Sequence, residues 1–232
     1  LGDKVIAKSV AKQNHIPIIE SNEGTLNTPD EALSEAVRIG YPVILKAASG
    51  GGGRGMRVVR TPVELEKSFN EARSEAKNAF GDGTIFLEKF IESPRHIEVQ
   101  IVADNHQNVV HLYERDCSVQ RRFQKVVEIA PSLNLKDKTR GKLYEYAIRI
   151  ARAVGYNNVG TVEFLVDTDE RIYFIEVNPR IQVEHTVTEM ITGIDLIKTQ
   201  IYIADGYHLN DPEIGLGDQS AITKNGFAMQ CR

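Results

Sequence analysis

Tryptophan is absent from the 232-residue chain, and only two cysteines, Cys117 and Cys231, are present. They form neither a Cys-x-x-Cys pair nor a Cys/His cluster of zinc spacing, which argues against a disulfide framework and a structural zinc site. No apolar run approaches the roughly 20 residues that a bilayer span requires, and the first residues contain no signal-peptide core. We therefore expect a cytoplasmic protein with reduced thiols and no membrane partner.

An excess of positive charge is also missing, because 28 basic residues face 32 acidic ones and give a net charge of -4. Nothing electrostatic therefore favours nucleic acid as a partner. With 41% apolar and 26% charged residues, the chain is long enough for one large domain or two small lobes. The first residues have the pattern of the interior of a secondary-structure element, and the last residues have the pattern of the middle of a strand. We therefore expect the sequence to be a piece of a longer polypeptide.

Periodicity and capping residues predict an α+β fold. Helices are expected at residues 3–14, 28–40, 61–80, 137–154 and 188–204. Strands are expected at residues 15–19, 42–46, 56–59, 84–90, 96–103, 109–114, 125–129 and 227–232, with a strand pair within 160–177. This order predicts a compact lobe at residues 18–90, and a main lobe of residues 1–17 and 91–232 with a broad antiparallel sheet.

Residues 50–55 contain five glycines, which cost backbone entropy and need a reason. A flexible linker is one reading, but apolar strands flank the run tightly. The dinucleotide fingerprint requires a following helix where a strand is expected, and the P-loop requires a Gly-Lys-Ser/Thr ending that is missing. The pattern favours a glycine flap over a nucleoside triphosphate, with Lys46 and Arg54 as counter-charges, although protein-kinase signatures are missing.

Two strands at residues 161–166 and 172–177 carry a possible cation site. If Asp169 and Glu170 form the tip of a two-residue turn, Glu163 lies opposite Glu176 at about 5 Å, where like charges are destabilising unless a cation intervenes or one is protonated. Asn178 projects from the same face and adds an amide oxygen, so the set suits Mg²⁺ held with substrate phosphates. A solvated face of an edge hairpin is the equally supported alternative.

Polar residues continue the alternation beyond this pair and share one face: Glu176, Asn178, Arg180, Gln182 and Glu184. Arg180 can grip a small oxyanion bidentately, Gln182 can hydrogen-bond it, and Glu184 can accept its proton. A further segment, residues 115–125, holds three arginines and a lysine. A surface charge run or a nucleic-acid patch would explain it, but phosphate or carboxylate recognition is favoured because Phe123 is its only aromatic residue.

Together these motifs resemble the ATP-grasp core of biotin carboxylase over essentially the whole chain. The resemblance rests on residues 1–4, 42–46, 50–56, 88–91, 94–96, 115–125 and 174–185. Residues 128–131, 178–179 and 184–190 are most similar to the biotin carboxylase domain of pyruvate carboxylases. The resemblance implies two lobes with antiparallel sheets that grip ATP, with residues 18–90 as the lid.

The resemblance also implies roles for individual residues. ATP phosphates would be held by Lys4, Lys46 and the amides of Gly52 and Gly53, adenine by Glu88 and the backbone of Lys89 and Ile91, and ribose by His96 and Gln120. Mg²⁺ or Mn²⁺ would be held by Glu163, Glu176 and Asn178. Bicarbonate would be held by Lys125, Arg180, Gln182 and the Val183 amide, with Glu184 as general base and Arg232 beside the biotin enolate.

The implied reaction carboxylates biotin. Glu184 deprotonates bicarbonate, which attacks ATP to give carboxyphosphate; this splits to CO₂ and phosphate, and the biotin enolate attacks CO₂. No Ala-Met-Lys-Met motif is present, so biotin is expected on a carboxyl carrier domain elsewhere, in a full-length homo-oligomer. Two departures are noted: Phe123 stands where the family usually has His, and the family's N-terminal Rossmann-like and C-terminal closing regions are not in the sequence.

Three alternatives stay open. The chain could serve an acetyl-CoA or other acyl-CoA carboxylase, or be an ATP-grasp ligase that joins a carboxylate to an amine, such as carbamoyl-phosphate synthetase or a purine-pathway enzyme. A non-catalytic nucleotide-binding module is disfavoured by the intact Glu163, Glu176, Arg180 and Glu184. ADP release that depends on a particular substrate would distinguish these functions.

Overall fold

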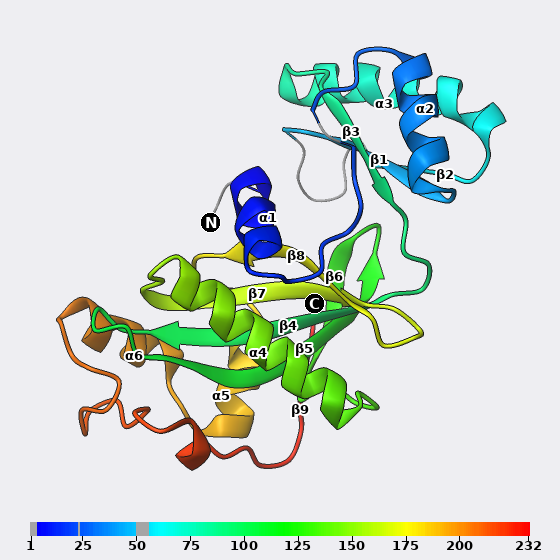
Figure 1. Ribbon diagram of the computed structural model, residues 1–232. Helices are drawn as coiled ribbons and strands as arrows, with labels where there is room; N and C mark the ends of the chain where they lie inside the picture. Colours follow the sequence, from blue (N-terminus) through cyan, green and yellow to red (C-terminus); the bar gives the residue numbers. More distant parts are fainter. Residues whose placement is uncertain (1–3, 23, 50–55) are drawn as a thin grey trace. The chain divides into compact units, whose positions relative to one another are not determined.

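The computed structural model describes residues 4–22, 24–49 and 56–232, and the chain divides into two compact units (Figure 1). Unit 1 comprises Leu1–Ile18, Ser93–Gln120 and Lys125–Arg232, and unit 2 comprises Ile19–Glu92 and Arg121–Gln124. Each unit contains an antiparallel sheet with helices packed on it, which confirms the predicted α+β class. No helix among the described residues is long and apolar enough to cross a bilayer.

Unit 2 is a small sheet with two helices. Its strands lie in the order β2 (Arg57–Val59), β1 (Val43–Ala47), β3 (Ile85–Lys89), and its helices are α2 (Pro29–Ile39) and α3 (Pro62–Phe80). Thr28 begins α2 as predicted, since its Oγ1 accepts a hydrogen bond from the Glu31 amide at 3.2 Å. Gly81 ends α3 with a φ of 75°, which favours glycine. The core between sheet and helices is almost wholly apolar.

Unit 1 is built on a six-stranded sheet. The strand order is β8 (Ile172–Asn178), β7 (Asn158–Val166), β4 (Arg95–Ala103), β5 (Val109–Arg121), β6 (Gln124–Ala130), β9 (Ala228–Cys231). Helices α1 (Lys4–Gln13) and α4 (Asp137–Ala153) contribute to the core on one face. Helices α5 (His185–Thr192) and α6 (Leu196–Ala204) pack elsewhere on the sheet, and a short 3₁₀ helix spans Gln219–Ala221.

The alternation along β4 decides where polar side chains go. Ile97, Val99 and Ile101 join the core with α1 and α4. Glu98 and Gln100, at the intervening positions, therefore project from the opposite face. Both are buried, at 0% and 1% exposure, so this second face carries polar groups that need internal partners.

Three predicted elements differ from the structure. Residues 15–19 form no full strand: only Ile18 bridges Phe174, and the Phe174 amide donates to the Pro17 carbonyl at 2.8 Å. The helix predicted at residues 188–204 is two helices, because Gly193 ends α5 with a φ of 72° and the Asp195 side chain caps α6. The strand predicted at residues 109–114 extends to Arg121.

Candidate active site

Four charged residues occupy matching positions in four neighbouring strands of unit 1. Glu176 on β8 pairs with Glu163 on β7, Glu163 pairs with Glu98 on β4, and Glu98 pairs with Arg115 on β5. The row thus places three carboxylates next to one another in the sheet. Carboxylates at such spacing repel each other, so the row requires cationic partners.

The predicted pairing of Glu163 with Glu176 is confirmed, but it does not arise from the predicted two-residue turn alone. Near the turn, Phe164 pairs with Phe174, so the register there is one residue short of the predicted one. A bulge between Glu163 and Phe164 restores the predicted register at the carboxylates. The two-residue turn is wrong as well, since the Asp167 amide bonds to the Arg171 carbonyl across a longer turn.

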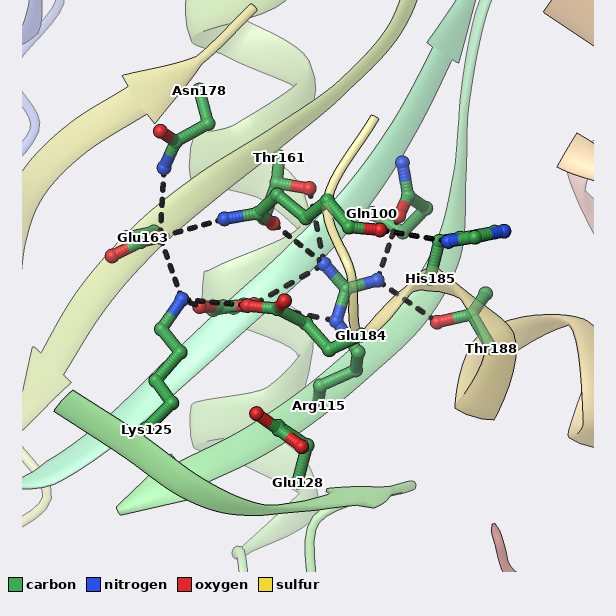
Figure 2. Close-up of polar contacts among 12 residues, drawn as sticks. Gln100, Arg115, Lys125, Glu128, Thr161, Glu163, Asn178, Glu184, His185 and Thr188 are labelled. Carbon is green, nitrogen blue, oxygen red and sulfur yellow. Dashed lines mark hydrogen bonds and ion pairs between the residues drawn. The ribbon is translucent and has the colours of Figure 1, made fainter. Parts of the chain in front are cut away.

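Lys125 supplies the central positive charge. Its Nζ donates to Glu184 Oε1 at 2.8 Å, to Glu163 Oε1 at 3.0 Å and to Glu98 Oε1 (Figure 2). An ammonium group has three donors, so each faces a different carboxylate. β6 delivers this side chain to carboxylates from β4, β7 and the start of α5, and the site therefore depends on the tertiary fold.

Arg232 is the second cation that contacts Glu184, and it also pairs with Glu128. Arg232 Nη2 lies 2.6 Å from Glu184 Oε2 and 2.7 Å from Glu128 Oε1, so the guanidinium bridges two carboxylates. Glu128 is fully buried, and neither of its oxygens accepts a hydrogen bond of good geometry. Burial raises the pKa of Glu128, an effect that Arg232 opposes and Glu184 reinforces.

The electrostatic environment keeps the carboxyl groups of Glu163 and Glu184 ionised. Burial acts to raise the pKa of Glu184, but the hydrogen bond and charge of Lys125 outweigh it and hold the pKa below its usual value. Burial opposes ionisation of Glu163 too, yet hydrogen bonds from His96 and Lys125 lower its pKa strongly. Glu184 is therefore a carboxylate at neutral pH and can accept a proton.

The three predicted metal ligands lie together. Asn178 Nδ2 donates to Glu163 Oε1 at 2.7 Å and lies 3.5 Å from Glu176 Oε1. The amide nitrogen thus partly neutralises the pair, and turning the amide over would present its oxygen to a cation. Two carboxylates and an amide oxygen at one spot fit a hard divalent cation.

The predicted ribose contacts, His96 and Gln120, are also paired. Gln120 Nε2 donates to the Cys117 carbonyl at 2.8 Å and lies 3.0 Å from His96 Nδ1. A carbonyl only accepts, so the nitrogen of Gln120 faces both groups and His96 Nδ1 must be an acceptor. His96 then carries its proton on Nε2 and donates to Glu163 Oε2 at 2.7 Å. The two residues thereby buttress a predicted metal ligand.

The polar face predicted for residues 176–184 is only partly observed. β8 ends at Asn178, so the strand alternation does not continue. Gln182 and Glu184 are buried within the cluster, with Gln182 Nε2 donating to Glu163 Oε1 at 3.0 Å. Arg180 is exposed instead and donates to the Ile181 carbonyl and to Asn178 Oδ1, while the Val183 side chain faces solvent.

The remaining predicted nucleotide contacts belong to unit 2 or lie outside the described residues. Lys46 Nζ forms an ion pair with Glu88, a buried residue of β3 in unit 2. The Lys89 amide donates to the Glu20 carbonyl at 2.8 Å, and Ile91 follows the end of β3. Gly52 and Gly53 lie outside the described residues, and so does the side chain of Lys4, which begins α1.

Sequence reasoning missed three members of the cluster: Glu98, Arg115 and Glu128. Glu98 carried a usable signal, because His96, Glu98 and Gln100 alternate with apolar residues just as Glu176 and Asn178 do. Arg115 was assigned to a segment for phosphate or carboxylate recognition, yet it is fully buried and bonds a carboxylate of its own chain. Glu128 lies among apolar residues and entered the prediction only within the family motif at residues 128–131, without a role.

The sequence of this chain is similar to those of known protein families and curated proteins. Residues 3–212 match the family model described as "Carbamoyl-phosphate synthase L chain, ATP binding domain". A pyruvate carboxylase from Schizosaccharomyces pombe is 55% identical over the whole chain, which spans 19% of that relative. The chain thus covers about a fifth of the length of the curated relatives it matches.

Solved structures agree with these sequence matches. The Campylobacter jejuni biotin carboxylase complexed with β,γ-ATP is 51% identical with a TM-score of 0.91, over 99% of this chain and 50% of that one. A Rhizobium etli pyruvate carboxylase gives 52% identity and a TM-score of 0.91, over 100% of this chain and 20% of that one. The biotin carboxylase domain of Hydrogenobacter thermophilus 2-oxoglutarate carboxylase, a dimer with MgADP, ADP and bicarbonate, is 48% identical with a TM-score of 0.90, over 100% and 50%.

The resemblance inferred from the motifs is therefore confirmed. The chain belongs to the family of the carbamoyl-phosphate synthase L chain ATP-binding domain, in which it is a biotin carboxylase ATP-grasp domain of the pyruvate carboxylase type.

Proposed function

We propose that this domain carboxylates biotin with bicarbonate, at the expense of ATP and through carboxyphosphate, as the biotin carboxylase part of a pyruvate carboxylase. Identity of 50–55% with pyruvate carboxylases over the whole chain supports the assignment. Related solved structures contain a nucleotide, and two contain bicarbonate.

One observation carries the proposal: a buried carboxylate, an ammonium and an amide donor converge on one spot. Glu184 Oε1 and Glu163 Oε1 both contact Lys125 Nζ, and Gln182 Nε2 contacts the same Glu163 oxygen. Two hydrogen-bond donors beside a proton acceptor are what a bicarbonate ion requires. In this account the two donors turn from Glu163 to the substrate oxygens, joined by the Val183 amide and by Arg180.

The same geometry explains how Glu184 can act as general base. Its pKa is lowered because Lys125 offsets the effect of burial. When Lys125 turns to a bound anion, its positive charge no longer stabilises the Glu184 carboxylate. Burial then raises the pKa of Glu184 and favours its protonated form. Binding of bicarbonate thus strengthens the base that takes its proton, while Lys125 neutralises charge developing on the reacting groups. Arg232, which pairs with Glu184, would lie beside the biotin enolate.

We further propose that unit 2 acts as the lid lobe of the nucleotide site. Lys46 would exchange its ion pair with Glu88 for ATP phosphates, together with Lys4, Gly52 and Gly53, while Glu88 and the backbone of Lys89 and Ile91 contact adenine. His96 and Gln120 would contact ribose. Glu163, Glu176 and Asn178 would hold Mg²⁺ or Mn²⁺, which shields phosphate charge during transfer.

The decisive experiment measures ADP release by the full-length protein. Release that requires both bicarbonate and biotin supports the proposal. Release that instead requires a carboxylate and an amine indicates a ligase of the carbamoyl-phosphate synthetase kind, and ATP binding without release indicates a non-catalytic module. Supplying pyruvate, acetyl-CoA or another acyl-CoA with the biotinylated carrier domain then identifies the final acceptor. The carrier domain, the homo-oligomer and the cytoplasmic location stay predictions.

A further inference from the structure

Arg115 is a fully enclosed charge in unit 1, with 0% exposure of its side chain. It lies on β5, and its guanidinium donates to five side chains from β4, β7, α5 and the segment between β8 and α5 (Figure 2). The acceptors are Glu98 Oε2 at 3.2 Å, Gln100 Oε1 at 2.6 Å, Thr161 Oγ1 at 3.0 Å, Gln182 Oε1 at 3.0 Å and Thr188 Oγ1 at 3.0 Å. Burial lowers the pKa of Arg115, and the surrounding carboxylates oppose this effect.

A guanidinium group donates hydrogen bonds and accepts none. Every side chain that faces it must therefore present an oxygen, and an amide turned the other way would set its own N–H groups against those of Arg115. Gln100 obeys this rule: its oxygen faces Arg115, and its nitrogen donates to the Gly160 carbonyl at 2.8 Å. The rule fixes the orientation of each amide without reference to any ligand.

For Gln182 this orientation has a chemical consequence. Its Oε1 accepts from Arg115, which leaves Nε2 directed at Glu163 Oε1, beside the ammonium of Lys125. The half of the amide that reaches the candidate bicarbonate site is thus a donor. A free glutamine could rotate its amide by half a turn and present an oxygen, which would repel an anion.

Arg115 also controls Lys125 through Glu98. Arg115 takes Oε2 of this carboxylate, and Lys125 takes Oε1. Glu98 is fully buried, so it depends on these two cations for compensation of its charge. The same guanidinium therefore holds both the amide donor and the anchor of the ammonium donor.

We propose that Arg115 is a positioning residue for bicarbonate, which fixes Gln182 as a donor toward the substrate oxyanion and steadies Lys125 through Glu98. This inference rests on the proposed function. Arg115 touches neither reacting group, and its effect on the reaction passes through the two residues that do. None of its five side-chain partners is among the residues proposed to hold the ATP phosphates, so its loss should affect bicarbonate and ATP differently.

The test compares Arg115→Lys with Thr188→Val in the full-length protein, by bicarbonate-dependent ADP formation. Lysine keeps the charge but cannot hold Glu98 and Gln182 in one rigid fork. We expect the KM for bicarbonate to rise at least about tenfold, as befits one lost hydrogen bond to a charged group, with the KM for ATP within about twofold of the parent. Thr188→Val removes one Arg115 contact without touching Gln182 or Glu98, and should leave both KM values within about twofold.

Several outcomes would overturn the inference. A fall in kcat with both KM values unchanged would assign Arg115 a purely structural role, and equal changes in Thr188→Val would do the same. A parent enzyme with no bicarbonate dependence would refute the proposed function instead. If Arg115→Lys does not fold, neutron diffraction from the unmodified protein decides: deuterium on Gln182 facing Glu163 supports the inference, and a reversed amide refutes it.

Discussion

The two units of the chain bury polar groups to very different extents. Unit 2 buries Asn22 and Glu88 outside its apolar core, and Glu88 has Lys46 as its ion-pair partner. Unit 1 buries a row of charged residues across its sheet, among them Glu98, Arg115 and Glu163. Burying charges costs free energy unless each is paired. The prearranged polar site of unit 1 therefore lowers the free energy of unfolding of that unit, whereas unit 2 is stabilised by an apolar core between its sheet and its helices.

The largest expected effect concerns Glu184, the proposed general base of this polar site. Glu184→Gln keeps the shape of the side chain but cannot accept a proton, so bicarbonate-dependent ADP formation should fall by about 10²–10⁴-fold. ATP binding should be unchanged, as measured by calorimetry on the full-length protein. Glu145→Gln, which alters an exposed carboxylate on α4, serves as the control. Turnover within about twofold of the parent would remove Glu184 from the mechanism.

A cavity in the apolar core of unit 2 should lower the free energy of unfolding. Phe69 on α3 is fully buried there, and Phe69→Ala should lower the free energy of unfolding by about 3–5 kcal/mol, because it leaves a cavity. Val63→Ala on the same helix changes a side chain that is 92% exposed and should cost less than about 0.5 kcal/mol. Urea unfolding, with hydrogen exchange of the α3 amides, measures both. Equal effects at the two positions would contradict the burial contrast.

Unit 1 should also show an acid sensitivity centred on His111. This ring stacks on Tyr144 with centroids 3.9 Å apart, and burial lowers the pKa of His111 to about 4, with Glu114 opposing. The unfolded chain takes up the proton near pH 6.5, so stability is full above that value and is lost as the pH falls through 4. His111→Phe keeps an aromatic ring that cannot be protonated.

The measurement compares urea unfolding of parent and variant between pH 7 and pH 4. The acid-induced loss should be smaller in His111→Phe by up to about 3 kcal/mol, from roughly 2.5 pKa units. His106→Phe makes the same exchange at an exposed histidine and serves as the matched control. Parallel profiles for parent and His111→Phe would show that this ring is not the acid-sensitive group.

The smallest effect is expected at the edge of the carboxylate row. Glu176→Gln removes the charge of a proposed metal ligand and also relieves repulsion with Glu163, its cross-strand partner. The Mg²⁺ concentration needed for half-maximal ATP hydrolysis should rise at least about tenfold, while the free energy of unfolding changes by less than about 1 kcal/mol. Lost stability with an unchanged Mg²⁺ requirement would make the pair structural. Glu170→Gln, in the turn between β7 and β8, is the matched control.

Sequence alone determined the local features of this protein. Thr28 and Gly81 mark helix ends because capping is a property of a few adjacent residues. The alternation in β7 and β8, together with the length of the turn, was enough to pair Glu163 with Glu176, although the bulge beside them was not foreseen. The family motifs indicated most of the residues that now lie together.

Tertiary structure decided the rest, because it joins strands that are distant in the chain. The row from Glu176 to Arg115 exists only through the strand order β8-β7-β4-β5, which no local pattern specifies. Burial turned Arg115 from a presumed ligand for phosphate or carboxylate into an internal cation, and it exposed Arg180 where a strand would have directed it inward. Charge compensation is a property of the assembled cluster, so no single segment of sequence could determine it.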